Sequence, residues 1–189
     1  MTFRKINKVY FVGIGGIGMS GIAELLLNLG FQVSGSDMNE NDNVERLKSL
    51  GVDIKIGHYP ANLTDADVLV YSSAVSLENP EIIKARQKGI PVIRRAEMLG
   101  ELINVKETSI AVGGTHGKTT TSSMIGAVLS HAKMDPTLVV GGLVQNLDTN
   151  SKLGSGDIII VEADEFDRSF LALKPTIGII TNIELEHTD

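Results

Sequence analysis

Short apolar runs alternate along this chain with segments in which apolar residues recur every three or four positions. The segment 17–29 has this helical spacing and is followed by Gly30, a residue typical of the position after a helix. Apolar runs that predict strands lie at residues 9–12, 31–34, 53–56 and 68–71. A strand, a helix of this length and a second strand form a crossover unit, so we expect a parallel sheet with right-handed connections.

More elements of the same kind complete the first domain. Helices are expected at residues 43–50, 79–88 and 96–103, and a short strand at residues 92–93. We place the end of this domain near Asn104. The sequence therefore predicts a Rossmann-like α/β domain over residues 1–104.

The remaining residues, 105–189, predict a second α/β domain. Strands are expected at residues 109–112, 138–140, 157–161 and 176–180, with a helix at residues 119–131. The last two strands are continuous apolar runs, which predicts parallel strands that are buried on both faces. With four strand candidates and a polar, ionisable stretch after the last one, we expect only the first part of a longer domain.

The composition excludes several classes of function. Hydrophobic residues make up 42% of the 189 residues and charged residues 21%, as in ordinary globular proteins. The net charge is -6 and no basic cluster exceeds Arg94–Arg95, which argues against a nucleic acid partner. The absence of cysteine removes disulfides, thiolate metal sites and cysteine nucleophiles. No run has the apolar length of a signal peptide or a membrane span, so the default expectation is a cytoplasmic protein without a membrane partner.

A glycine-rich loop at residues 113–121 lies between a predicted strand and a predicted helix. Backbone N–H groups in such a loop bind phosphate, Lys118 supplies a charge for phosphate oxygens, and the Thr119 hydroxyl suits Mg²⁺. The usual phosphate-loop spacing would place its first glycine at Val112, so an alternative is a glycine turn with an incidental lysine. The predicted triphosphate-binding residues are Gly114, Thr115, His116, Gly117, Lys118, Thr119 and Thr120.

An earlier glycine loop follows the first predicted strand. Gly13, Gly15 and Gly18, with Asp37 nineteen residues after Gly18, fit the dinucleotide-binding pattern and by themselves suggest NAD. The glycines would serve any nucleotide diphosphate equally well, and they could also serve only close packing. The pair Ser72–Ser73 follows another strand and could donate hydroxyls to the same ligand or cap the next segment.

Carboxylates follow the buried strand at residues 157–161. Glu162 comes first, at the strand end where α/β proteins bind ligands, and could hold the Mg²⁺ that bridges nucleotide phosphates. The acidic residues that follow, Asp164, Glu165 and Asp167, fit a solvated loop as well as they fit a functional role. His187 stands in the same position after the last strand, beside Glu184, Glu186 and Asp189, although a lone histidine is more often structural.

Taken together, these motifs resemble those of the ATP-dependent Mur ligases of peptidoglycan synthesis, and the similarity covers the whole chain. The motif at residues 114–120, GTHGKTT, is the most specific and accounts for the misfit at Val112. The other motifs lie at residues 12–21, 35–37, 57–58, 72–74, 95–99, 162–165 and 182–187. The resemblance implies a Rossmann-like parallel-sheet domain followed by the first part of a P-loop ATP-binding α/β domain.

The resemblance also implies roles for particular residues. The first domain would bind a UDP sugar and not NAD, with Asp37 reading the nucleotide portion. Lys118 would contact ATP phosphates, and Thr119, Glu162 and His187 would hold Mg²⁺, so that Lys118, Glu162 and His187 are the expected catalytic residues. The family often has Asp where Glu186 precedes the histidine. The implied UDP-sugar-binding residues are Gly15, Gly16, Ile17, Gly18, Ser36, Asp37, Ser72 and Ser73.

The implied reaction joins L-alanine to UDP-N-acetylmuramate through an acyl phosphate formed with ATP. The nearest alternative attaches a whole peptide to the same sugar, but residues 38–43 lack the Tyr-Pro-Pro type of segment associated with that recycling enzyme. A nucleotide sensor or an NAD-dependent oxidoreductase with an appended triphosphatase module is a third reading. The family also has a later part of the central domain and a C-terminal domain, so this chain alone is expected to be inactive.

Overall fold

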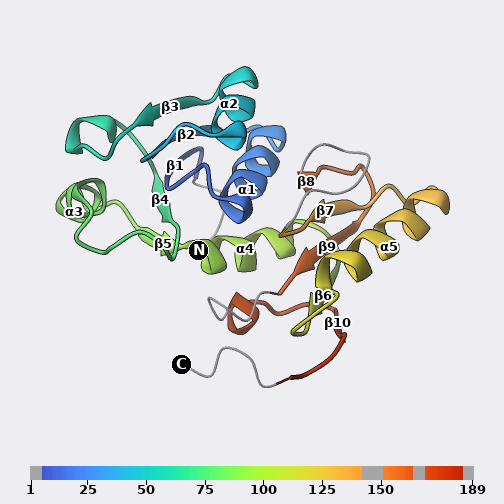
Figure 1. Ribbon diagram of the computed structural model, residues 1–189. Coiled ribbons are helices and arrows are strands. Elements are labelled where there is room, and N and C mark those ends of the chain that lie inside the picture. Colours follow the sequence, from blue (N-terminus) through green and yellow to red (C-terminus); the bar gives the residue numbers. More distant parts are fainter. Residues whose placement is uncertain (1–5, 142–150, 164–168, 185–189) are drawn as a thin grey trace. The chain divides into compact units, whose positions relative to one another are not determined.

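The computed structural model describes residues 6–141, 151–163 and 169–184, and the chain divides into two compact units, residues 1–95 and 96–189 (Figure 1). The predicted boundary near Asn104 lies just beyond helix α4, Arg95–Leu102, most of which belongs to the second unit. None of the helices in the described ranges is long and apolar enough to cross a membrane.

The first unit contains a five-stranded parallel sheet with the order β3-β2-β1-β4-β5, as the crossover pattern predicts. Its strands are β1 Lys8–Val12, β2 Gln32–Asp37, β3 Asp53–Ile56, β4 Val68–Tyr71 and β5 Val92–Arg94. Its helices are α1 Ile17–Asn28, α2 Asp42–Ser49 and α3 Pro80–Gln87, with a short 3-10 turn at Pro60–Asn62. Every strand and helix predicted before residue 95 is confirmed.

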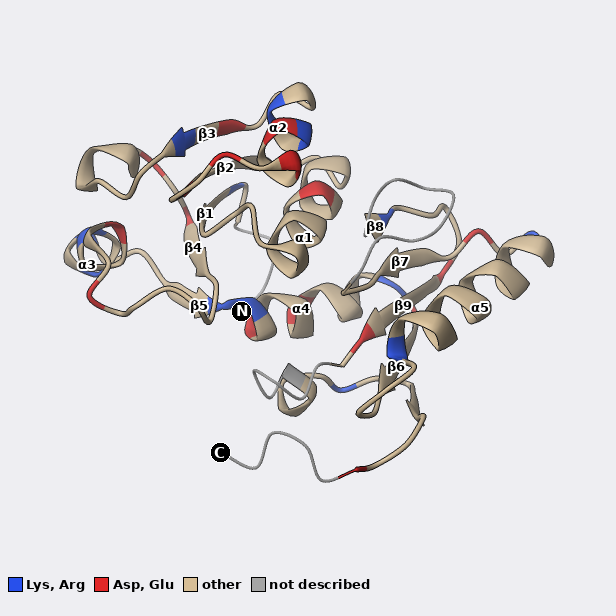
Figure 2. Ribbon diagram, viewed as in Figure 1, with Lys and Arg blue, Asp and Glu red and all other residues tan. Residues whose placement is uncertain are grey.

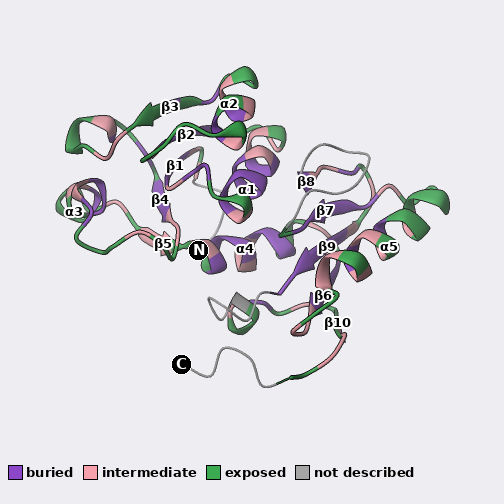
Figure 3. Ribbon diagram, in the orientation of Figure 1, coloured by how far each residue is buried: buried purple, intermediate pink, exposed green. Residues whose placement is uncertain are grey.

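The apolar strands of this sheet are buried on both faces. Tyr10 and Val12 of β1 pack with Leu69 and with Ile82 of α3 in one cluster. Val9 and Phe11, the alternate residues of β1, are also buried and point to the opposite face, because successive side chains of a strand alternate. Figure 3 shows this burial along β1 and β4, at the centre of the sheet.

The N-terminal ends of helices α2 and α3 are capped by asparagine side chains. Asn41 accepts a hydrogen bond from the Val44 N–H at the start of α2, and Asn79 accepts one from the Glu81 N–H at the start of α3. In both helices acidic residues lie in the first turn and basic residues in the last, which suits the helix dipole (Figure 2).

The second unit contains a five-stranded sheet with the order β10-β6-β9-β7-β8. Its strands are β6 Thr108–Gly113, β7 Thr137–Val139, β8 Ser151–Lys152, β9 Ile158–Glu162 and β10 Ile177–Ile180. Helix α5 spans Lys118–His131, and 3-10 turns lie at Ile103–Val105 and Ser169–Leu171. The predicted strands and helix are confirmed, whereas β8, which pairs antiparallel with β7, was not predicted.

The unpredicted strand β8 is tied to the chain before β7 by polar contacts. Asp135 accepts hydrogen bonds from Lys152 Nζ at 2.8 Å and from the Ser155 N–H at 2.8 Å. The Lys152 ammonium first, and then Ser155, hold the pKa of the Asp135 carboxyl well below its usual value. A two-residue strand has no hydrophobic periodicity, so only its backbone pairing with β7 reveals it.

The expectation that both late apolar strands are buried on both faces is half wrong. In β9, Ile159, Ile160 and Val161 are buried, as predicted. In β10, Ile177 is 47% exposed and Ile180 is 68% exposed. Strand β10 lies at the edge of the sheet that the structure describes and pairs only with β6 there (Figure 3). Its Ile179 packs against the core cluster around Val112, whereas Ile177 and Ile180 lack cover in the described residues.

Gly35 of β2 allows the close approach of β1. A Cβ at Gly35 would lie 2.5 Å from the backbone oxygen of Phe11, its partner in the parallel register. Because backbone cannot move aside as a side chain can, we expect Gly35→Ala to lower the free energy of unfolding by about 1–3 kcal/mol in urea denaturation. Gly178→Ala is the matched control, since a Cβ there meets nothing within 4 Å. Equal effects of the two substitutions would contradict this account.

Candidate functional site

A cavity of about 630 Å³ opens in the first unit at the carboxyl ends of β1, β2 and β4. This is where the strand order changes direction around β1, the usual ligand position in a parallel α/β sheet. The residues that line the cavity are Gly13, Gly15, Gly16, Asp37, Met38, Asn41, His58, Ser72, Ala74, Val75, Ser76, Glu78 and Asn79.

The glycine loop after β1 is held in place by the end of β2. Gly13, at φ +79°, and Ile14 both donate backbone N–H groups to the Ser36 carbonyl oxygen. The Gly15 N–H donates to Asp37 Oδ2 at 2.7 Å. Asp37 thus braces the loop directly, and its carboxylate lies within the cavity wall.

Four of the eight predicted UDP-sugar-binding residues line the cavity: Gly15, Gly16, Asp37 and Ser72. Ile17 is exposed and is absent from the lining, as is Ser73. Gly18 instead makes room for Arg95, whose Nη1 would lie 2.8 Å from a Cβ at that position. Ser36 is fully buried behind the lining. The eight assignments remain predictions.

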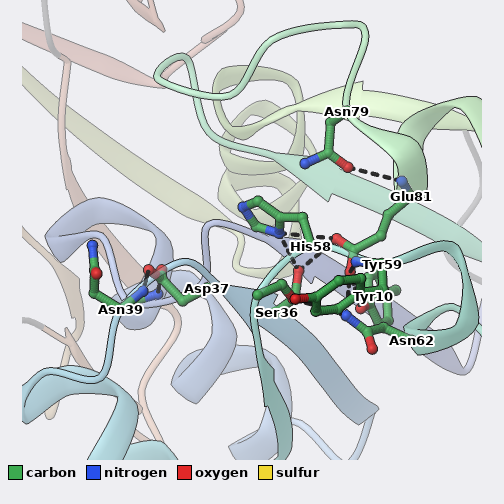
Figure 4. A network of polar contacts seen from close by, with 11 residues as sticks. Tyr10, Ser36, Asp37, Asn39, His58, Tyr59, Asn62, Asn79 and Glu81 are labelled. Carbon is green, nitrogen blue, oxygen red and sulfur yellow. Dashed lines mark hydrogen bonds and ion pairs between the residues drawn. The ribbon is translucent and has the colours of Figure 1, made fainter.

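A buried polar network behind the cavity centres on Glu81 of α3, which is fully buried (Figure 4). Glu81 Oε1 accepts hydrogen bonds from Asn62 Nδ2 at 2.7 Å, the Tyr10 hydroxyl at 3.2 Å and the Tyr59 N–H at 3.3 Å. Oε2 accepts one from the Ser36 hydroxyl at 2.6 Å and lies 3.2 Å from His58 Nδ1.

Neither His58 nor Glu81 is among the predicted site residues, although Gly57–His58 is one of the motifs that carry the resemblance. His58 follows β3 within the Gly57–His58 motif, which was a usable signal because the residue stands after a strand of the sheet. Glu81 gave no signal, because an acidic residue after Asn79 and Pro80 is typical of an ordinary helix start. Only the packing of α3 against the sheet brings Glu81 behind the cavity wall, next to His58.

The second candidate site is the phosphate loop between β6 and α5. Gly117 caps α5 in the left-handed conformation at φ +81°, and Gly114 has φ +132°, so both positions favour glycine. Lys118 Nζ folds back on the loop and donates to the Gly114 carbonyl oxygen at 2.6 Å. An apolar cavity of about 430 Å³ borders the loop at Gly113, Gly114 and Thr115.

The segment after β10 holds the other side of this loop. Asn182 Oδ1 accepts the His116 N–H at 2.9 Å, and the Thr181 hydroxyl donates to the His116 carbonyl oxygen at 2.6 Å. The Glu184 N–H donates to the Thr115 hydroxyl at 3.0 Å. In this arrangement the His116 N–H, a loop group that could bind a phosphate, is paired with the side-chain oxygen of Asn182.

Glu162 ends β9 beside Val112 of β6, the strand that leads into the loop. Its side chain is buried, and Oε2 accepts the Gly141 N–H at 2.8 Å. Thr119 lies in the first turn of α5, so two of the three predicted metal ligands offer oxygen, as Mg²⁺ prefers. His187, together with the acidic residues at 164–167, 186 and 189, lies outside the described residues. Within the described part, no group of three or more His, Asp or Glu residues is arranged to hold a metal ion.

Comparison with known protein families decides what these two loops belong to. A family model described as "Mur ligase family, catalytic domain" matches residues 8–107, and one described as "Mur ligase middle domain" matches residues 112–189. The chain belongs to the Mur ligase family. Neither match favours the NAD-dependent alternative.

Individual relatives agree with the family assignment. The Mur ligase chain is 58% identical over 187 residues to the UDP-N-acetylmuramate–L-alanine ligase of Trichlorobacter lovleyi, covering 99% of this chain and 41% of that protein. Among solved structures, the UDP-N-acetylmuramate–alanine ligase of Thermotoga maritima superposes with a TM-score of 0.88 at 36% identity, over 95% of this chain and 42% of that one. The chain thus spans about two fifths of the length of these relatives.

One further solved structure bears on the choice of amino substrate. The UDP-N-acetylmuramate:L-alanyl-gamma-D-glutamyl-meso-diaminopimelate ligase of Neisseria meningitides also superposes with a TM-score of 0.88, at 28% identity. The match covers 97% of this chain and 63% of that one. The fold is therefore common to both kinds of Mur ligase, and the backbone alone does not separate them.

We expect Asn182→Ala to loosen the phosphate loop of the Mur ligase chain. The His116 N–H loses its acceptor, so amide hydrogen exchange in residues 113–118 should speed up about tenfold, the equivalent of one hydrogen bond. Asn104→Ala is the control, because Asn104 makes a comparable exposed bond, to the Gly100 carbonyl oxygen. Unchanged exchange in the Asn182 variant would show that the bond does not hold the loop.

The buried Tyr10 hydroxyl should resist ionisation. Burial first, and then the Glu81 carboxylate, raise the pKa of Tyr10 well above its usual value of 10.0. Its contribution to stability is therefore full below pH 10.0 and is lost as the pH rises toward the folded-state value. In an alkaline titration followed by tyrosinate absorbance, we expect Tyr10→Phe to remove a step that lies above pH 10.0. Removal of an earlier step would contradict the expectation.

Proposed function

We propose that this chain is the UDP-sugar-binding and phosphate-loop part of an enzyme that joins L-alanine to UDP-N-acetylmuramate with ATP. The observation that carries the proposal is the 58% identity over 99% of the chain to a UDP-N-acetylmuramate–L-alanine ligase. The two loops, each at the carboxyl edge of its own sheet, supply the chemistry that such a reaction needs from this part of the enzyme.

The cavity of the first unit suits the UDP sugar. Its volume of about 630 Å³ lies within the range of pockets for small ligands. None of its described lining residues is Lys or Arg, and the N–H groups of Gly13, Ile14, Gly15 and Gly16 already donate within the protein, so the diphosphate charge would be met by the positive end of α1.

The phosphate loop of the second unit suits ATP. Lys118 donates to the carbonyl oxygens of Gly114 and Thr115, so its ammonium group already lies over the loop that would hold the phosphates. Thr119 and Glu162 offer oxygen ligands for Mg²⁺, and His187 is proposed as a further ligand. Mg²⁺ bound there would neutralise charge on the phosphates of ATP. These residues position and neutralise ATP, which is most of what phosphoryl transfer requires.

The proposed reaction has two steps. The muramate carboxylate attacks the γ-phosphate of ATP, which gives an acyl phosphate and ADP, because a carboxylate itself cannot expel oxide. The amine of L-alanine then attacks the acyl carbon, and the tetrahedral intermediate collapses to the amide and phosphate. ATP and UDP sugars are cytoplasmic metabolites, so we place this step of peptidoglycan precursor synthesis in the cytoplasm.

A second candidate is the attachment of a whole peptide to the same UDP sugar. The superposition on the Neisseria meningitides ligase favours it, but at 28% identity against 58% for the alanine ligase. Both candidates require the same UDP-sugar cavity and the same phosphate loop. They differ only in the amine, which a comparison of L-alanine with the tripeptide as substrates for the whole enzyme would decide.

Thermal-shift titration of this chain tests the proposed ligands. UDP-N-acetylmuramate and MgATP should each stabilise it, by about 2.7 kcal/mol at one hundred times the dissociation constant, whereas NADH should not. Lys118→Met should weaken MgATP at least about tenfold and leave UDP-N-acetylmuramate unchanged, because the two ligands use different units. Lys174→Met, an exposed lysine in the same unit, is the control. Stabilisation by NADH alone would overturn the proposal.

A further inference from the structure

Glu81 is a fully buried carboxylate that the proposed reaction does not use. It is surrounded by groups from four separate segments: β1, the end of β2, residues 58–62 and its own helix α3. A buried carboxylate is costly unless donors satisfy it, and here each of its oxygens accepts at least one hydrogen bond. Its position directly behind His58 points to a role in the cavity in addition to packing.

We propose that Glu81 is a positioning residue for UDP-sugar binding: with Ser36, it fixes the ring orientation and tautomer of His58 so that Nε2 is presented to the ligand. The inference rests on the proposed function. Figure 4 shows His58 with one ring nitrogen directed at Ser36 and Glu81 and the other directed away from them.

The hydrogen bonds around His58 indicate which of its two ring nitrogens carries the proton. The Ser36 hydroxyl donates its single proton to Glu81 Oε2 at 2.6 Å. Ser36 Oγ, which lies 2.9 Å from His58 Nδ1, can then only accept from the ring. Nδ1 therefore carries the proton, whether it donates to Ser36 Oγ or to Glu81 Oε2 at 3.2 Å.

The opposite ring nitrogen is left for the ligand. In the neutral ring with its proton on Nδ1, Nε2 is an acceptor and matches an N–H or O–H donor of a nucleotide or sugar, not a phosphate oxygen. His58 lines the cavity together with the acidic side chains Asp37 and Glu78. Among the groups around Glu81, Tyr10 keeps its proton because its pKa is raised. It therefore adds no second negative charge beside Glu81.

The decisive substitution is Glu81→Gln, which keeps the shape but replaces an acceptor oxygen with an amide that can donate. The glutamine amide can donate to Nδ1, and the ring proton then moves to Nε2, where it no longer suits the ligand donor. We expect ¹⁵N NMR of the ring to show a change from the Nδ1–H to the Nε2–H tautomer. UDP should then bind roughly tenfold more weakly in calorimetry, the loss of about one hydrogen bond.

Tyr10→Phe is the matched control. It removes one donor to Glu81 Oε1 and the contact between the Tyr10 hydroxyl and Ser36, but Ser36 keeps Glu81 Oε2 as its acceptor, so the tautomer and the affinity for UDP should not change. A general loosening of the network would affect both variants, whereas the positioning role predicts that only Glu81→Gln changes the ring.

The wild-type chain provides the test even where Glu81→Gln fails to fold. His58 is one of four histidines, so its ring signals can be assigned by their loss in His58→Gln. An Nε2–H tautomer in the ligand-free wild type would overturn the positioning role outright, as would unchanged UDP affinity in a folded Glu81→Gln variant. Failure of the wild type to bind UDP at all, with the Nδ1–H tautomer present, would instead overturn the proposed function and the ligand assigned to Nε2.

Discussion

Parallel strand pairing is the constraint on which both candidate sites depend. Parallel strands must be joined by crossovers, so the loops after the strands gather at one edge of a sheet. In the first unit β1 lies between β2 and β4, and the loops after these three strands form most of the cavity wall. In the second unit β6 lies between β9 and β10, which brings Glu162 and Thr181 to the ends of the strands beside the phosphate loop.

The two sites differ in how firmly their surroundings hold them. The cavity of the first unit is backed by a fully buried carboxylate whose donors come from several segments of the chain. The phosphate loop is held on one side by the segment that follows β10, the least buried strand of its sheet. Local opening follows burial, so the phosphate loop has the weaker support in the described residues. That difference suits a loop that must exchange its own hydrogen bonds for those of a phosphate.

The two glycine loops also show how the same residue type serves different ends. Gly13 and Gly117 adopt left-handed backbone, as a turn into a helix requires. Gly18, which fits the dinucleotide pattern as well as the others do, makes room for the Arg95 side chain and not for the ligand cavity. A spacing pattern records that a glycine is needed, but it does not record what approaches it.

The sequence by itself determined the order of the elements, the parallel sheets and the family, because hydrophobic periodicity and loop motifs are local properties of the chain. It also placed Gly15, Asp37 and the phosphate loop correctly at strand ends. Only the tertiary structure decided that β10 is exposed while β9 is buried, since two equal apolar runs differ only in their neighbours. It alone brought Glu81 behind His58, because residues 23 positions apart in the chain meet only when α3 packs on the sheet.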